Sequence, residues 1–230
     1  ILKKIFNNIE FSKNNINLGK IKLNDDWLKY INNYYTEKNL LSNFDILIPL
    51  SATQGKFLRG YNSSTNEKKL NTIFEILSEF KNLKIVFKPH SKSDMNYFKK
   101  LIDGYDLKYS ISDLHLNYLC NLSKLVLTYH PTSAQIYAKH FKKNVIEYGE
   151  YDQKIENLLN GNPRYFESVD KRVRTDKKEL KETIEYYLNR PNVSYEKKYL
   201  KKDTLSDIHD KIGSFDKWVN IFLLFVREDV

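Results

Sequence analysis

The segments KIVFKPHSKSD (residues 84–94) and KLVLTYHPTSAQIYA (residues 124–138) share one arrangement. Each starts as an apolar run typical of a buried strand, passes through a turn with a histidine beside a proline, and ends where helical spacing begins. In an open α/β sheet, ligands bind at the carboxyl ends of the strands. Two such turns, each with a histidine and small hydroxyl residues, therefore predict one anion-binding site.

The surrounding sequence alternates strand-like and helix-like patterns. Short, continuously apolar runs predict strands with both faces buried at residues 44–50, 84–88, 107–111, 125–129 and 144–148. Helical spacing of apolar residues lies between them, at residues 67–80, 95–102, 113–122 and 133–141. The alternation predicts an α/β protein with a Rossmann-like, doubly wound parallel sheet and flanking helices at both ends.

Three regions are expected along the chain. Residues 1–43 are interpreted as a helical or linker segment from a preceding domain, residues 44–152 as the nucleotide-binding core, and residues 153–230 as a helical segment packing on that core. Residues 215–226 (FDKWVNIFLLFV) predict a final apolar helix. Core or interdomain packing is the favoured role of that helix, and contact with a membrane surface beside the lysines of residues 197–202 is the alternative. The chain does not begin with methionine, so we expect a fragment of a longer protein.

Composition narrows the classes of partner. The net charge of +9 suits an anionic partner, such as nucleic acid, a sugar nucleotide or an acidic membrane surface. The basic residues are scattered and no nucleic-acid-binding motif is present, so no nucleic-acid partner is expected. A composition rich in lysine, asparagine and isoleucine is also typical of proteins from an AT-rich genome, so the positive charge can arise without an anionic partner. Cys120 is the single cysteine, which excludes intrachain disulfides, and its apolar neighbours favour a buried packing role.

The first histidine turn offers groups that suit a phosphate. Lys88 and His90 provide a cation and an imidazole, Pro89 stiffens the turn and Ser91 adds a hydroxyl. Such groups hold a phosphate and stabilise the charge of a departing one. The alternative is that His90 is only a structural turn residue.

The second turn offers His130 and two hydroxyl residues, Thr132 and Ser133, at the start of a helix. Either hydroxyl suits an N-cap, and the free N–H groups of a helix N-terminus suit a phosphate. Capping alone would explain both hydroxyls equally well.

Further candidates lie outside the two histidine turns. Gly55 and Arg59 belong to the loop at residues 51–66, which matches no standard nucleotide fingerprint and is equally well interpreted as a mobile surface loop. Glu147 lies at the end of the fifth strand. A carboxylate at a strand end holds ribose hydroxyls in dinucleotide folds, and the alternative is that Glu147 is a solvated loop charge. No acidic metal motif is present, so we expect no metal and no cofactor beyond a nucleotide-sugar substrate.

The turn Lys88-Pro89-His90-Ser91, the Thr132-Ser133 turn and the strand at residues 144–147 resemble a known family. They are similar to the C-terminal half of GT-B-fold glycosyltransferases of bacterial surface polysaccharides. The groups concerned are the sialyltransferase and polysialyltransferase type, the Kdo transferases and the CDP-glycerol transferases. The similarity covers residues 44–152.

The resemblance implies a function and roles for particular residues. His90, Thr132 and Ser133 would grip the donor phosphate, with His90 rather than His130 as the family's histidine. The chain would be the donor-binding half of an inverting, metal-independent glycosyltransferase that uses a CMP-linked donor and a bacterial surface glycan as acceptor. A cytoplasmic location, with peripheral contact to the inner membrane, is implied as well. A non-catalytic nucleotide- or glycan-binding module of a polysaccharide assembly system is the alternative.

Three departures from the family pattern leave the donor open. Ser91 stands where the family has proline, His130-Pro131 where it has small residues, and Gln135 where it often has glutamate. No general base is evident in this chain, and its oligomeric state is left open.

Overall fold

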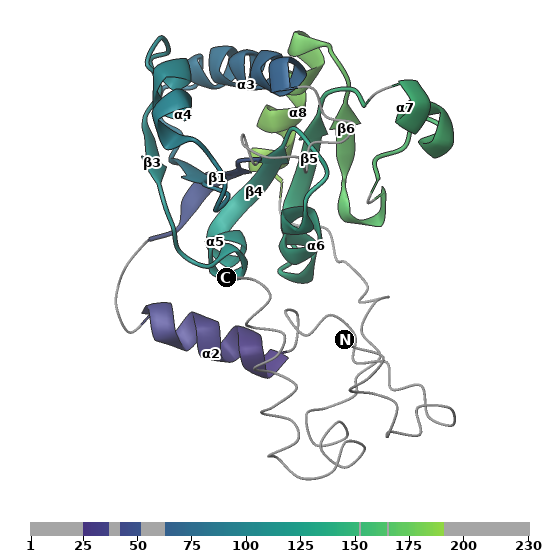
Figure 1. Cartoon of the computed structure of the whole chain (residues 1–230). Helices are drawn as coiled ribbons and strands as arrows, with labels where there is room; N and C mark the ends of the chain where they lie inside the picture. Colours follow the sequence, from purple (N-terminus) through teal and green to yellow (C-terminus); the bar gives the residue numbers. More distant parts are fainter. Residues whose placement is uncertain (1–24, 37–41, 52–62, 152, 165, 191–230) are drawn as a thin grey trace, which may run out of the picture. The chain divides into compact units, whose positions relative to one another are not determined.

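The computed structural model describes residues 25–36, 42–51, 63–151, 153–164 and 166–190. The described residues form one parallel sheet with helices on both faces (Figure 1). Its strands are β1 (Phe44–Pro49), β2 (Ile85–Lys88), β3 (Tyr109–Ile111), β4 (Ser123–Thr128), β5 (Asn144–Tyr148) and β6 (Lys171–Val173). The helices are α2 (Asp25–Thr36), α3 (Ser63–Ser78), α4 (Met95–Ile102), α5 (Leu116–Leu122), α6 (Ser133–His140), α7 (Gln153–Leu159) and α8 (Lys177–Leu188), and Phe166–Ser168 forms the short 3₁₀ helix η2.

The strand order is β3-β2-β1-β4-β5-β6, and every neighbouring pair is parallel. The chain first builds outward from β1 to β3, then returns to pair β4 with β1 and builds outward in the other direction. The order of the strands therefore reverses between β1 and β4. This is the doubly wound arrangement expected from the sequence, and its reversal point is where ligands bind in open α/β sheets.

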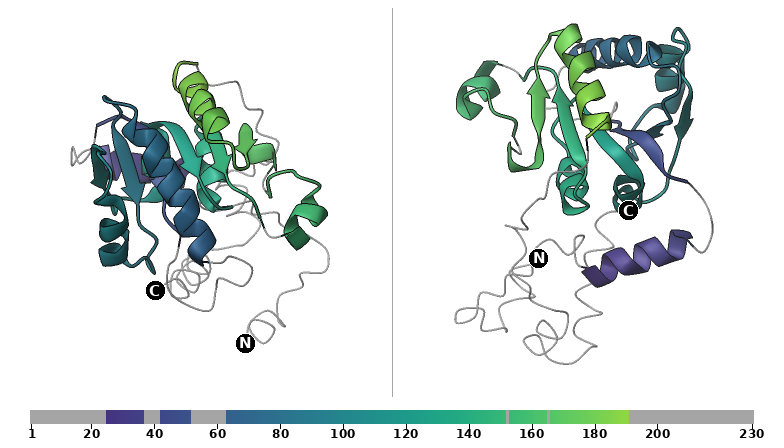
Figure 2. Two further views of the ribbon diagram at one scale, coloured as in Figure 1. Left: turned by 90° about the horizontal axis from the view of Figure 1, so that it is seen from above. Right: turned by 180° about the vertical axis from the view of Figure 1, so that it is seen from behind.

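The two faces of the sheet are covered by different helices. Figures 1 and 2 show α3, α4 and α8 over one face and α5 and α6 over the other. Buried aromatic rings pack edge to face beneath α3 and α4, where the Phe87 centroid lies 5.8 Å from that of Phe74 and 5.0 Å from that of Phe98. These contacts anchor β2, so the turn that follows β2 starts from a rigid position.

Several predicted boundaries are confirmed. Helix α4 begins after Asp94, whose carboxylate accepts hydrogen bonds of 3.0 Å from the main-chain N–H groups of Asn96 and Tyr97. Helix α6 begins after Thr132, whose hydroxyl accepts one from the N–H of Ala134 at 3.4 Å. Both side chains satisfy N–H groups that a helix leaves without an intrahelical partner.

The structure corrects the prediction of a purely helical segment after residue 152. Strand β6 pairs with β5 and extends the sheet, and α8 then packs back against β4, β5 and β6. β6 was missed because two of its three residues, Lys171 and Arg172, are charged. The predicted final helix at residues 215–226 lies outside the described residues, and so do residues 1–24. Within the part that is described, no helix has the length and apolarity needed to cross a membrane.

Candidate functional site

The two histidine turns lie at the same edge of the sheet. His90 follows β2 and His130 follows β4, and these strands lie on either side of β1. The pKa of His130 is lowered to about 3, first by burial and then by the nearby Lys69 and His90. Ser51, after β1, is hydrogen-bonded both to the residue before His130 and to the third residue after His90, so the two turns lie close together. The structure thus brings both predicted turns to the reversal point of the sheet.

His90 is exposed, and its ring is oriented by the turn that carries it. The main-chain N–H of Lys92 donates to His90 Nδ1 at 3.1 Å. Because a backbone N–H can only donate, Nδ1 must present its lone pair, and the proton of the neutral ring is on Nε2. His90 therefore offers an N–H donor on the side of the ring that faces away from its own turn.

Lys88 supplies a cation next to this turn. Its side chain is 20% exposed, and its Nζ lies 3.9 Å from an oxygen of Asp113. Burial lowers the pKa of Lys88, and Asp113 acts in the opposite direction. Pro89 is half-buried and Ser91 is exposed, so the hydroxyl of Ser91 is accessible to a ligand.

His130 differs from His90 in its surroundings. Its Nδ1 atom is covered, and no described residue provides a hydrogen-bond partner for it. With a pKa of about 3, the imidazole is neutral at physiological pH. His130 therefore has no positive charge to offer a phosphate, and only an uncharged contact with a donor remains as its predicted role.

The start of α6 lies directly after His130. Thr132 is engaged as the N-cap of this helix, while Ser133 is exposed. The predicted capping role is therefore carried by Thr132, and the hydroxyl of Ser133 stays accessible. Gly55 and Arg59, the two candidates in the loop after β1, lie outside the described residues.

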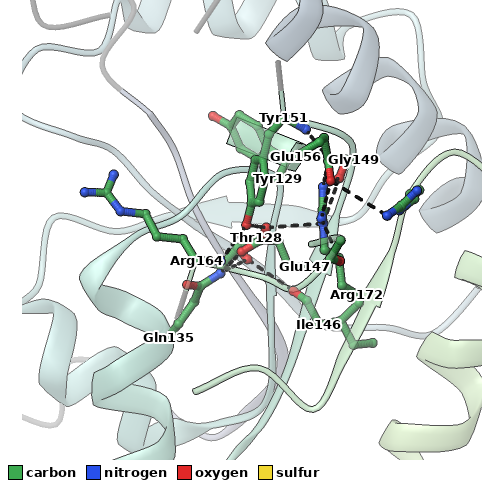
Figure 3. Close-up of polar contacts among 12 residues, drawn as sticks. Thr128, Tyr129, Gln135, Ile146, Glu147, Gly149, Tyr151, Glu156, Arg164 and Arg172 are labelled. Carbon is green, nitrogen blue, oxygen red and sulfur yellow. Dashed lines mark hydrogen bonds and ion pairs between the residues drawn. The ribbon is translucent and has the colours of Figure 1, made fainter. Parts of the chain in front are cut away.

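Glu147, at the end of β5, lies inside a polar network (Figure 3). Its side chain is 1% exposed. One carboxylate oxygen accepts a hydrogen bond from Gln135 Nε2 and the other from the hydroxyl of Tyr151. Gln135 Nε2 also donates to Thr128 Oγ1 at 2.9 Å. The structure leaves Glu147 no exposed oxygen for a ribose hydroxyl, because its two carboxylate oxygens already accept hydrogen bonds from α6 and from the segment after β5.

Arg172 of β6 completes this network, as Figure 3 shows. Its guanidinium contacts the carboxylate of Glu156 and donates to the carbonyl of Gly149 from Nη2 at 3.1 Å and to that of Gly161 from Nη1 at 3.1 Å. It also lies 4.0 Å from the ring centroid of Tyr151. The hydrogen bond from Arg172 is the main cause of the lowered pKa of Glu156. These contacts fix the segment that follows β5.

Lys69 of α3 is a buried cation that sequence reasoning missed. It is 7% exposed, and its Nζ donates to the carbonyl of Tyr129 at 3.2 Å. Burial lowers its pKa, and the nearby Glu147 acts in the opposite direction. A signal existed in the sequence, because Lys69 is next to Leu70 and four residues before Ile73, on the apolar face of the helix.

Gly149 makes room for Lys69. It has a φ of +115°, and a Cβ placed there would lie 2.4 Å from Lys69 Cε. We expect Gly149→Ala to destabilise the protein by about 1–3 kcal/mol, because alanine is strained at this φ and the lysine must move. Urea unfolding measures the loss. Gly104→Ala is the matched control, since a Cβ there meets nothing within 4 Å. Equal stability of the two variants would contradict the prediction.

In the part of the chain that the structure describes, no group of three or more His, Cys, Asp or Glu side chains is placed to hold a metal ion. The polar groups that do gather at the carboxyl edge of the sheet are the imidazoles of His90 and His130, the ammonium of Lys88 and the first turn of α6. They can donate hydrogen bonds to an anionic ligand at the reversal point.

No family model and no curated protein matches this chain. Solved structures that match include a protein of Listeria monocytogenes assigned as a UDP-N-acetylglucosamine 2-epimerase (15% identity, TM-score 0.42, 70% of this chain and 43% of that chain). Two others are the glycosyltransferase WaaG of lipopolysaccharide biosynthesis (12%, 0.43, 74% and 45%) and a glycosyltransferase of Rickettsia africae (16%, 0.43, 69% and 41%). This chain spans less than half the length of each of them.

Proposed function

We propose that the described unit is the donor-binding half of a glycosyltransferase that uses a nucleotide-activated sugar. The observation that carries the proposal is the His90 turn: an exposed imidazole, with its proton on Nε2, at the carboxyl end of β2 and beside the reversal point between β1 and β4. Lys88 adds a cation to the same turn. The similarity of this turn and of the Thr132-Ser133 turn to GT-B-fold glycosyltransferases supports the same function.

In the proposed reaction, the bond between the anomeric carbon of the donor and a phosphate oxygen breaks, and its electron pair stays on that oxygen. The His90 Nε2–H donates to the phosphate, and Lys88 balances the negative charge that develops there. The acceptor hydroxyl attacks the opposite face of the anomeric carbon, which inverts its configuration. The hydroxyl proton passes to a carboxylate base in another domain. The charge stabilisation comes from protein groups, so the proposed transfer requires no metal.

The proposed substrates follow from the sequence resemblance. We propose a CMP-linked sugar as the donor and a bacterial surface glycan as the acceptor. The reaction would take place in the cytoplasm, and peripheral contact with the inner membrane would bring the chain near a growing glycan.

A thermal-shift panel of CMP, CDP and UDP tests the proposal. We expect CMP to raise the melting temperature of the wild-type chain. His90→Ala should weaken nucleotide binding by about 10- to 100-fold, because a hydrogen bond to a charged group contributes about 1.5–3 kcal/mol. His140→Ala, at the far end of α6, is the matched histidine control. If no nucleotide raises the melting temperature of the wild type, the result contradicts the proposal and favours the alternative of a non-catalytic module. If His90→Ala leaves the shift unchanged, the site assignment is wrong.

A further inference from the structure

Ser93 closes the turn that carries His90. Its hydroxyl oxygen accepts a hydrogen bond from the main-chain N–H of His90 at 3.0 Å, and its own N–H donates to the His90 carbonyl at 2.9 Å. The two bonds fix the main chain between residues 90 and 93. Within this turn the N–H of Lys92 reaches His90 Nδ1. The orientation of the imidazole therefore depends on the turn that Ser93 closes.

Ser93 also ties this turn to the neighbouring strand. Its hydroxyl donates to the main-chain carbonyl of Ser51, the second residue after β1, at 3.0 Å. The same oxygen thus accepts from the loop after β2 and donates to the segment after β1. A hydroxyl can do both at once, whereas the alanine methyl group can do neither.

Tyr129 anchors the other end of this chain of hydrogen bonds. Its fully buried hydroxyl accepts from the N–H of Ser51 at 2.7 Å and donates to Ser51 Oγ at 3.1 Å. Burial raises the pKa of Tyr129, so its hydroxyl keeps the proton that it donates. Tyr129 directly follows β4. The carboxyl ends of β4, β1 and β2 are thereby joined in sequence, through Ser51 and Ser93, to His90.

We infer that Ser93 is a positioning residue that holds His90 as the neutral Nε2–H donor, through a hydrogen-bond chain anchored on the Tyr129 hydroxyl. The functional meaning of this orientation rests on the proposed nucleotide-sugar function. The tautomer itself does not, because it follows from the contact between Lys92 and His90 Nδ1. Nothing in the sequence marks Ser93 apart from the other serines, since its partner Ser51 is 42 residues away.

The test observes the His90 ring directly. Long-range ¹H–¹⁵N NMR of histidine-labelled protein reports which ring nitrogen carries the proton, and His90→Gln identifies the His90 signals by removing them. We expect His90 of the wild type to carry its proton on Nε2. In Ser93→Ala we expect a mixture of the two tautomers, and CMP binding weakened by about threefold to tenfold, the effect of losing a neutral hydrogen bond. Ser93→Thr keeps a hydroxyl and should restore both properties. Ser78→Ala, in a helix away from the site, is the control for loss of a serine hydroxyl.

The outcomes separate this inference from the proposed function. A tautomer that changes in Ser93→Ala but not in Ser93→Thr supports the positioning role, even if no nucleotide binds to the wild type and the proposed function fails. An unchanged His90 tautomer in Ser93→Ala overturns the positioning role, whatever binds. A wild-type His90 with its proton on Nδ1 overturns it as well.

Discussion

Replacing Arg172 with methionine is expected to lower the free energy of unfolding by about 3–5 kcal/mol, because it removes one member of a buried ion pair. The Arg172 side chain is 4% exposed, and its guanidinium contacts Glu156 and lies 3.8 Å from Glu147. Methionine can fill the space of the aliphatic part, but it removes the buried guanidinium from both carboxylates. The carbonyls of Gly149 and Gly161 also lose a donor. Urea unfolding followed by circular dichroism measures the effect.

Arg174 provides a matched control within the same strand-end region. Its guanidinium lies 3.8 Å from the same carboxylate of Glu156, but its side chain is 54% exposed. Water screens such a pair, so Arg174→Met should cost less than about 1 kcal/mol. Similar losses for the two variants would show that the network around Glu147 contributes no more than a surface ion pair.

The repeated strand and helix patterns were sufficient to predict the core of the fold. Strands β1, β2, β4 and β5 consist mainly of buried apolar residues, a pattern typical of strands with both faces covered. The cap of α4 was equally predictable, because Asp94 acts on N–H groups two and three residues away. The strand pattern is visible in consecutive residues, and the cap contact is local in the sequence, so neither feature needs knowledge of the tertiary contacts.

Strand β6 could not be predicted in the same way. Arg172 is charged, and it is buried only because Glu156 of α7 and the carbonyls of Gly149 and Gly161 meet it in the folded chain. A pattern of apolar residues contains no information about such partners. The same reason explains why the partner of Lys69 was not predicted, since its contact with Tyr129 joins residues 60 positions apart.

The candidate site was predictable in its position but not in its electrostatics. The two histidine turns were expected at one edge of the sheet, and the structure confirms this. Each histidine lies beside a proline, and the family resemblance already favours His90 over His130 as the contact to the phosphate. Only the fold shows that His90 is exposed while Nδ1 of His130 is covered and lies in the positive field of Lys69. Their different surroundings support the proposal that His90 contacts the phosphate.

The neutral state of His130 is expected to make the protein sensitive to acid. Its pKa is about 3 in the folded protein, lowered by burial and by Lys69 and His90, against 6.5 for an unperturbed histidine. Between these values the unfolded chain binds more protons at this residue, so the free energy of unfolding falls as the pH is lowered through this window. His130 contributes a slope of up to about 1.4 kcal/mol per pH unit to the free energy of unfolding. Its contribution to the loss of stability from pH 7 to about pH 4.5 is roughly 2–3 kcal/mol.

His130→Phe isolates this contribution. Phenylalanine keeps an aromatic ring beside Tyr129, whose centroid lies 4.7 Å from that of His130, and it cannot be protonated. We expect urea unfolding of the variant to show a smaller loss of stability between pH 7 and pH 4.5 than the wild type, by the amount given above. His140→Phe, at the end of α6, controls for replacing a histidine elsewhere. An identical pH dependence in wild type and His130→Phe would mean that His130 has the same pKa in the folded and unfolded protein. His130 would then become a cation as the pH falls through 6.5, the unperturbed value, and could offer that charge to a phosphate.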